Sequence, residues 1–171
     1  QVDGLLKQWP NTEYRGWYLG DWVPPMGINP QDPQSIDIVN NCFLSECYHM
    51  MTKIAKALGK EADIPGYQQK HEALNSLIHE TFFDEEQHNY ASASQIDLIY
   101  PMLVGATPDG LVSSVRATLM QESAGRFKGH IATGLVGVNI LTQWATKNQE
   151  TDYVYQMLKK RTYPGYLYMI D

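Results

Sequence analysis

From residue 35 to residue 160, apolar residues recur every three or four positions in six segments that are grouped two by two. The first segment runs from Ile36 to Leu58 and stops at Gly59, which is the pattern of an amphipathic α-helix with a glycine at its end. A short break through Asp63-Ile-Pro65 leads to a second helical segment that ends near Phe82. Two helices joined by so short a break must lie antiparallel, as an αα-hairpin.

The same arrangement follows twice more, with helices predicted over 94–104 and 109–123 and then over 132–147 and 150–160. Patterns typical of strands are almost absent, and no tight sequence repeat is visible. We therefore predict an all-α protein of one domain, built from three successive antiparallel αα-hairpins over 35–83, 94–123 and 132–160. Methionines at 50, 51, 102 and 120 are expected in its core.

Residues 1–34 interrupt this regularity, because they hold five of the nine prolines together with Trp9, Trp17, Tyr18 and Trp22. So many prolines and glycines cannot propagate a helix or a central strand, and so many aromatic residues are unusual in a disordered tail. We expect an irregular but ordered segment. The other end, 161–171, closes on an apolar and aromatic stretch where a polar tail is usual, so we expect the chain to be a piece of a longer protein.

Composition excludes several classes of protein. The 13 basic and 19 acidic residues give a net charge of −6 without a basic cluster, which disfavours binding to nucleic acid. No apolar run approaches the roughly 18 residues of a membrane span, and no secretion leader opens the chain, so the compartment stays open. Cys42 and Cys47 lie roughly 140° apart around one helix and cannot bridge each other.

Metal and nucleophile chemistry also lack their usual patterns. The five histidines include no His-Glu-x-x-His, and the acidic segment from Asp84 to Asn89 does not match a calcium loop and indicates a solvated turn. No Gly-x-Ser-x-Gly is present, and neither cysteine has an evident base. We expect neither a metal nor a cofactor.

Two segments could bind a ligand. In the first, Asp21 and Trp22 stand in a loop framed by glycine and proline. The indole face can pack on the C–H face of a sugar ring while the carboxylate accepts its hydroxyl protons. The alternative is an aromatic plug in the core beside an aspartate that caps a loop.

The second segment leads from Gly125 through His130 and Thr133 into a helix start at Gly134. Unpaired backbone N–H groups and small residues at such a start let a ligand approach closely. His130 could donate to a sugar hydroxyl. The alternative is a histidine that caps the helix, with Gly134 and Gly137 present for tight packing.

Three blocks of the chain resemble the bacterial α-L-rhamnosidases of glycoside hydrolase family 78, in order and in spacing. They are Gly20-Asp21-Trp22-x-Pro, Gly129-His130-Ile-Ala-Thr133-Gly-Leu-Val-Gly and Lys160-Arg-Thr-Tyr163-Pro-Gly-Tyr166-Leu-Tyr-Met-Ile. The resemblance implies an (α/α)6 barrel, of which this chain would form an incomplete toroid. It also implies an inverting enzyme that releases terminal α-L-rhamnose, with an acid and a base roughly 6.5–9.5 Å apart.

In that family the general acid lies upstream of the first block and the general base follows the last one. The resemblance therefore implies a chain that is inactive alone, without catalytic residues, and that lines part of the sugar site. Trp22 would stack on the sugar, Asp21 and His130 would bind its hydroxyls, and Thr133 and Gln95 are further candidates near helix starts that face the barrel mouth.

Two other functions stay open at this point. One is a helical module that binds a carbohydrate or a peptide without chemistry. The other is a different toroid glycosidase, of the glucoamylase or trehalase kind, in which Asp21 would be catalytic. The expected partner is a rhamnosylated glycan or glycoside. Because an incomplete toroid leaves apolar flanks uncovered, we also expect self-association, unless residues 1–34 cover the gap.

Overall fold

The computed structural model describes residues 3–8, 13, 18–25 and 33–170. The predictions made for Trp9 and Trp17 lie outside these residues. The helices and strands, in chain order, are α1 (Gln34–Ala57), the 3-10 turn Glu61–Asp63, α2 (Ile64–Phe82), β1 (Phe83–Asp84), β2 (Asn89–Tyr90), α3 (Gln95–Val104), α4 (Asp109–Ala124), α5 (Leu135–Lys147), α6 (Thr151–Leu158) and the 3-10 turn Leu167–Met169.

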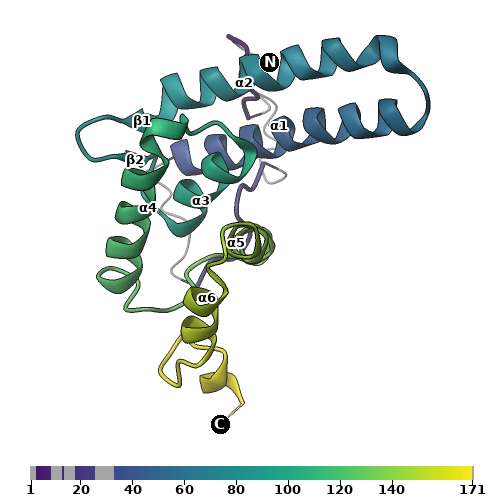
Figure 1. Ribbon diagram of the computed structural model, residues 1–171. Helices are drawn as coiled ribbons and strands as arrows, with labels where there is room; N and C mark the ends of the chain where they lie inside the picture. Colours follow the sequence, from purple (N-terminus) through teal and green to yellow (C-terminus); the bar gives the residue numbers. More distant parts are fainter. Residues whose placement is uncertain (1–2, 9–12, 14–17, 26–32, 171) are drawn as a thin grey trace.

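The six helices form three successive hairpins, which confirms the all-α fold class. Each hairpin packs its two helices together, and α3 lies between α1 and α5. Figure 1 shows α1 and α2 side by side across the top, α5 seen end-on below them, and α6 beyond it toward the C-terminus. The first helices of the hairpins, α1, α3 and α5, thus form one row, with their partners on its outer side, as in an incomplete α/α toroid.

Local chemistry explains both ends of α3. Gly105 ends α3 in the left-handed conformation, with φ of 80°, where a glycine carries no steric cost. Ser94 begins the same helix by accepting a hydrogen bond from the Asp97 backbone N–H. The helix expected from 132 begins only at Leu135, because the backbone N–H groups of Ala132 and Gly134 bind side chains from distant parts of the chain.

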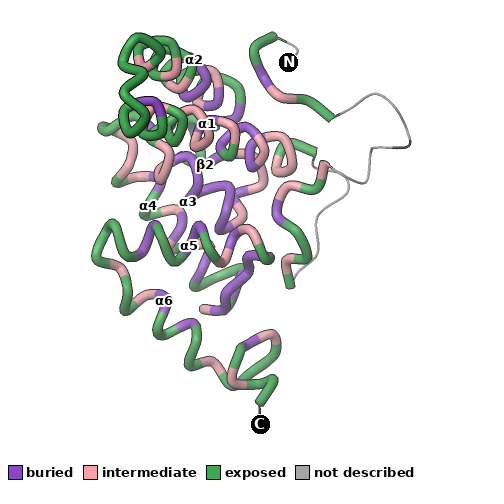
Figure 2. Tube along the Cα trace, turned by 90° about the vertical axis from the view of Figure 1, so that its right-hand side faces the viewer, coloured by how far each residue is buried: buried purple, intermediate pink, exposed green. Residues whose placement is uncertain are grey.

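The core centres on α3 and the elements around it. Figure 2 shows buried segments gathered at α3 and β2, whereas α2 and α6 are mostly exposed. Trp144, Tyr90 and Tyr100 are its largest fully buried side chains. Met102 and Met120 pack against this core as predicted. The prediction for Met50 and Met51 is wrong: both are exposed, because this face of α1 lies at the end of the helix row.

One element was not predicted. β1 and β2 form a two-residue antiparallel hairpin, with Phe83 opposite Tyr90 and Asp84 opposite Asn89. Asp84 Oδ1 shapes the turn by accepting hydrogen bonds from the backbone N–H groups of Glu86 and Gln87, at 2.9 and 3.0 Å. Across the described ranges, no helix is both long enough and apolar enough to cross a bilayer.

Candidate sugar site at the start of α5

Asp21 and Trp22 dock onto the N-terminal end of α5. Asp21 Oδ2 accepts a hydrogen bond from the Gly134 backbone N–H at 2.6 Å, and Oδ1 accepts one from the Gly137 N–H at 2.9 Å. The Trp22 carbonyl accepts one from the Leu135 N–H at 2.8 Å. These groups satisfy backbone N–H groups that a helix start leaves without partners, and the carboxylate also suits the positive end of the helix dipole.

Gly134 and Gly137 make this docking possible. A Cβ at Gly134 would overlap the Trp22 carbonyl and lie 2.9 Å from Asp21 Oδ1, and a Cβ at Gly137 would lie 2.8 Å from Asp21 Oδ2. Both glycines are therefore needed for the close approach of residues 21–22. Burial raises the pKa of Asp21, while the backbone N–H groups of Gly134, Gly137 and Val136 oppose that rise.

The candidate side chains divide into two groups. Asp21 is 7% exposed, and both of its oxygens are taken by the α5 backbone. Trp22, in contrast, is 53% exposed, so its indole is accessible to a ligand. His130 and Thr133 are buried, and among the residues that the structure describes, His130 Nδ1 and Thr133 Oγ1 have no hydrogen-bond partner.

His130 is held by a neighbour from the C-terminal segment. Its Nε2 lies 3.1 Å from the Thr162 hydroxyl. Burial lowers the pKa of His130, and the nearby charges of Lys160 and Lys128 lower it further. The lowered pKa favours the neutral ring, in which Nδ1 is either a donor or an acceptor, according to whether Nε2 carries the proton.

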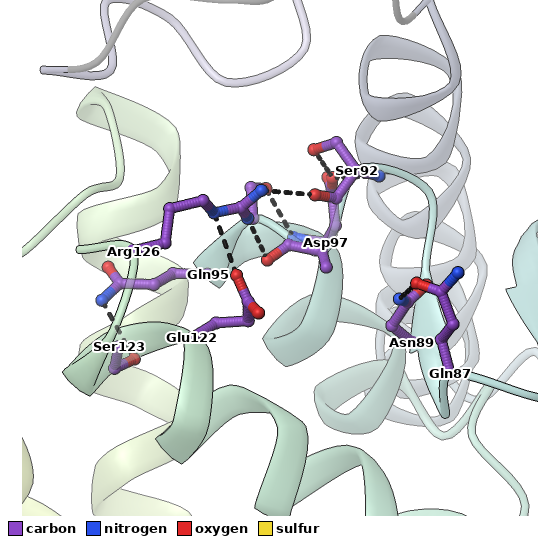
Figure 3. Close-up of polar contacts among 10 residues, drawn as sticks. Gln87, Asn89, Ser92, Gln95, Asp97, Glu122, Ser123 and Arg126 are labelled. Carbon is purple, nitrogen blue, oxygen red and sulfur yellow. Dashed lines mark hydrogen bonds and ion pairs between the residues drawn. The ribbon is translucent and has the colours of Figure 1, made fainter.

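Gln95 stands at the start of α3 as expected, but its side chain is fully buried. Its amide oxygen accepts a hydrogen bond from the Ala132 N–H at 2.7 Å, and its amide nitrogen donates to the His130 carbonyl at 3.0 Å. The amide nitrogen also donates to the Ser123 hydroxyl at 3.3 Å (Figure 3). Gln95 therefore fixes the loop that carries His130, and its geometry does not support direct contact with a sugar.

Asp97 holds the neighbouring helix starts together. Its Oδ1 accepts from the Ser35 hydroxyl at 2.7 Å, and its Oδ2 accepts from the Ser92 hydroxyl at 2.6 Å. Burial raises the pKa of Asp97, and its hydrogen bonds oppose the rise. Since Ser35 belongs to the first turn of α1, this carboxylate ties α1 to α3 at the end of the row where Asp21 caps α5.

The described residues hold no group of three or more His, Cys, Asp or Glu side chains placed to bind a metal. Near the start of α5 they hold the exposed Trp22 and, on the loop fixed by Gln95, two buried polar atoms without a hydrogen-bond partner among the described residues.

A family model for the six-hairpin glycosidase domain of bacterial α-L-rhamnosidases matches residues 2–171. The chain belongs to this family. An α-L-rhamnosidase of Alteromonas sp. (strain LOR) is 28% identical over 168 residues, which cover 90% of this chain. The α-L-rhamnosidase structure from Dictyoglumus thermophilum matches with a TM-score of 0.79 and 29% identity, over 88% of this chain.

A third likeness, to the Streptomyces avermitilis α-L-rhamnosidase complexed with L-rhamnose, covers 99% of this chain with a TM-score of 0.80 and 20% identity, and shows the fold alone. The chain spans 17% of the length of the Alteromonas relative and 17% of the Dictyoglumus chain. The resemblance of the chain to the α-L-rhamnosidases is thus confirmed.

Thr162 and Lys160, which lie near His130 in the structure, were not named as site residues from the sequence. Both belong to the third block, Lys160-Arg-Thr-Tyr163, which carried the resemblance without a role for its residues. The contact between Thr162 and His130 spans 32 residues. Helical spacing gives no signal for a contact across such a separation, although the co-occurrence of the two blocks could have suggested it.

Proposed function

We propose that this chain forms part of the L-rhamnose-binding wall of an α-L-rhamnosidase. In this wall the Trp22 indole packs on the sugar ring, and His130 Nδ1 and Thr133 Oγ1 bind its hydroxyls. The proposal rests on His130 Nδ1 and Thr133 Oγ1, two of the three buried side-chain atoms without a hydrogen-bond partner among the described residues; the third is Thr107 Oγ1. Such atoms are costly unless a ligand or water binds them. Asp21 and Gln95 would position the wall and would not touch the sugar.

The proposed reaction of the whole protein is inverting hydrolysis of terminal α-L-rhamnosides, and the chain alone does not perform it. Such hydrolysis needs a general acid and a general base on opposite sides of the bond, roughly 6.5–9.5 Å apart. The carboxylates nearest the wall in this row of helix starts, Asp21 and Asp97, are buried and bound by protein N–H and hydroxyl groups. Neither is free to protonate a leaving group or to activate water.

Titration of the chain with methyl α-L-rhamnoside, followed by NMR, tests the binding wall. We expect shifts of the Trp22 indole N–H and of the His130 ring signals, and weaker binding in Trp22→Ala. The matched control is Trp144→Phe, which changes a buried indole away from the wall and should keep the affinity. Absence of shifts in the folded chain would contradict the wall. Appreciable hydrolysis of an aryl α-L-rhamnoside would contradict the proposed inactivity.

We also propose that the isolated chain self-associates through one face of α1. Phe43, Ile54 and Leu58 are 58%, 43% and 66% exposed and recur at helical spacing. Exposed apolar surface of this kind is typical of a contact face. We propose that the same face of a second copy of the chain packs against it.

A further inference from the structure

A polar pit lies between the β-hairpin and the end of α4. Its volume is about 540 Å³, within the range of small-molecule sites. Its lining includes Asp84, Gln87 and Asn89 from the hairpin and Glu122 and Arg126 from the end of α4 and the loop after it. In Figure 3, Arg126 and Glu122 stand on one side, Gln87 and Asn89 on the other, and Ser92 between them.

Two segments that line the pit lead toward the proposed rhamnose-binding wall. Its floor includes Ala91, Ser92 and Ala93, which lead directly into α3. Arg126 donates a hydrogen bond to the Ser92 carbonyl at 3.0 Å and also to the Ala93 carbonyl. Because Arg126 stands four residues before His130, one loop lines both the pit and the wall.

Protein contacts hold the polar side chains of the pit in place. Glu122 Oε2 lies 3.0 Å from Arg126 Nε. Asp84 Oδ1 is fixed by the turn, and Asn89 Nδ2 donates to Gln87 Oε1 at 3.1 Å. Each of these contacts engages one polar atom of a side chain and thereby fixes the orientation of that side chain. A ligand that binds in the pit would therefore cost little additional side-chain entropy.

Three side chains of the pit keep a second polar atom that makes no hydrogen bond to the described residues. In the part of the chain that the structure describes, no protein hydrogen bond is made by Asp84 Oδ2, Gln87 Nε2 or Asn89 Oδ1. A carboxylate oxygen, an amide donor and an amide oxygen without a protein hydrogen bond thus belong to side chains that line one pit. Adjacent hydroxyl groups of a sugar, each both a donor and an acceptor, match this set.

The charge of the pit narrows the class of sugar. Asp84 and Glu122 outnumber Arg126, whose guanidinium is occupied by Glu122 and two carbonyls. The turn adds the acidic residues Glu85 and Glu86 nearby. An anionic sugar, such as a uronate or a sulfate ester, would be repelled, whereas a neutral one would not.

We infer that this pit binds a neutral sugar unit of the glycoside whose rhamnose occupies the wall. The inference rests on the proposed function, because it names the rest of the same substrate. It accounts for the acidic hairpin, which the sequence alone indicated to be only a solvated turn.

The test compares three ligands on the folded 171-residue chain by NMR titration: methyl α-L-rhamnoside, a neutral rhamnosyl-glucose disaccharide and methyl glucoside. We expect the disaccharide and methyl glucoside to shift the side-chain amide signals of Gln87 and Asn89. In Asp84→Asn/Gln87→Ala the Kd of the disaccharide should rise three- to tenfold per lost hydrogen bond, with the Kd of methyl α-L-rhamnoside unchanged. The exposed turn variant Glu86→Ala is the matched control.

The outcomes separate this inference from the proposed function. If methyl α-L-rhamnoside binds but neither glucose-containing ligand shifts the two amide signals, sugar binding in the pit is contradicted and the proposed rhamnose-binding wall is supported. If methyl glucoside shifts the amide signals while methyl α-L-rhamnoside does not bind, sugar binding in the pit is supported and the proposed rhamnose-binding wall is contradicted. If no ligand binds, both are overturned. A rhamnosyl-glucuronate that binds as well as the neutral disaccharide would contradict the charge argument.

Discussion

The carboxylate of Asp21 accepts a hydrogen bond from the backbone N–H of Gly134 at 2.6 Å, across 113 residues of sequence. This contact joins the irregular first segment of the chain to the start of the third hairpin. It places the exposed Trp22 indole next to the loop that carries His130 and Thr133. Asp21 therefore builds the proposed wall without itself offering an oxygen to the sugar.

Replacement of Asp21 by asparagine should destabilise the chain. The amide has one acceptor where the carboxylate has two, and its NH2 group would face a buried N–H of α5. We expect the free energy of unfolding to fall by about 2 kcal/mol, the scale of a lost charge-assisted hydrogen bond with an unsatisfied donor. Urea denaturation followed by circular dichroism measures this change.

The control for Asp21 is Asp152→Asn, in the exposed first turn of α6. This variant also removes a carboxylate near a helix start, but it breaks no buried contact. We therefore expect its free energy of unfolding to fall by less than about 0.5 kcal/mol. Equal losses of unfolding free energy in the two variants would show that the docking of Asp21 onto α5 makes no specific contribution to stability.

Replacement of Gln95 by leucine should loosen the His130 loop. The leucine fills similar space but leaves the Ala132 N–H and the His130 carbonyl without their buried partner. We expect a loss of about 2–4 kcal/mol in the free energy of unfolding, since each such group costs about 1–3 kcal/mol. Hydrogen exchange of the Ala132 amide should accelerate far more than exchange in α1.

The exposed Gln121 of α4 provides the comparison for Gln95. Gln121→Leu makes the same chemical change on the surface and should leave the exchange of the Ala132 amide as it is. If Gln95→Leu also left that exchange unchanged, the loop would not depend on the Gln95 amide.

The sequence predicts the six helices well because their signal is local. Apolar residues three and four positions apart, Gly59 and Gly105 after helix ends, and Ser94 before a start act within one or two turns. Contacts made by side chains across the chain leave no such trace. The exact start of α5 depends on the partners that Ala132 and Gly134 find at Gln95 and Asp21, and the spacing of apolar residues does not encode them.

The candidate site residues were named from the same kind of local signal. Trp22, His130 and Thr133 stand beside glycines or a helix start, where residue types alone suggest binding. Residue types do not show whether a polar side chain points toward a ligand or binds other groups of the protein, because that depends on how the side chain is buried in the fold. Gln95 stands at the expected helix start, but its amide binds the Ala132 N–H and the His130 carbonyl, and Thr162 was not named at all.

Stability should fall as the pH falls below about 6.5, in part because of His130. Its pKa is lowered in the folded chain by burial and by Lys160 and Lys128, so the unfolded chain binds the proton more readily. Protonation therefore favours unfolding as the pH drops from the unfolded pKa through the folded one. Unfolding free energies at pH 7.5 and 5.5 should differ less in His130→Gln than in the unchanged chain.

An intermediate variant sharpens this test. Lys160→Gln removes one of the two lysine charges but keeps the burial, so it should raise the pKa of His130 part of the way toward its ordinary value. NMR titration of the His130 ring measures that pKa directly. A pKa that stays the same in Lys160→Gln would contradict a role for the Lys160 charge.

Self-association through α1 should be weakened by polar substitution of its exposed face. Phe43→Ser/Ile54→Gln removes two large apolar side chains that together would be buried between two copies, each burial being worth up to about 1.5–3 kcal/mol. We expect the association constant to fall at least tenfold, measured by sedimentation velocity over a range of concentrations. Leu135→Gln, at an exposed apolar position on α5, is the matched control and should associate like the unchanged chain. An unchanged chain that stays monomeric at all concentrations would contradict the proposed contact.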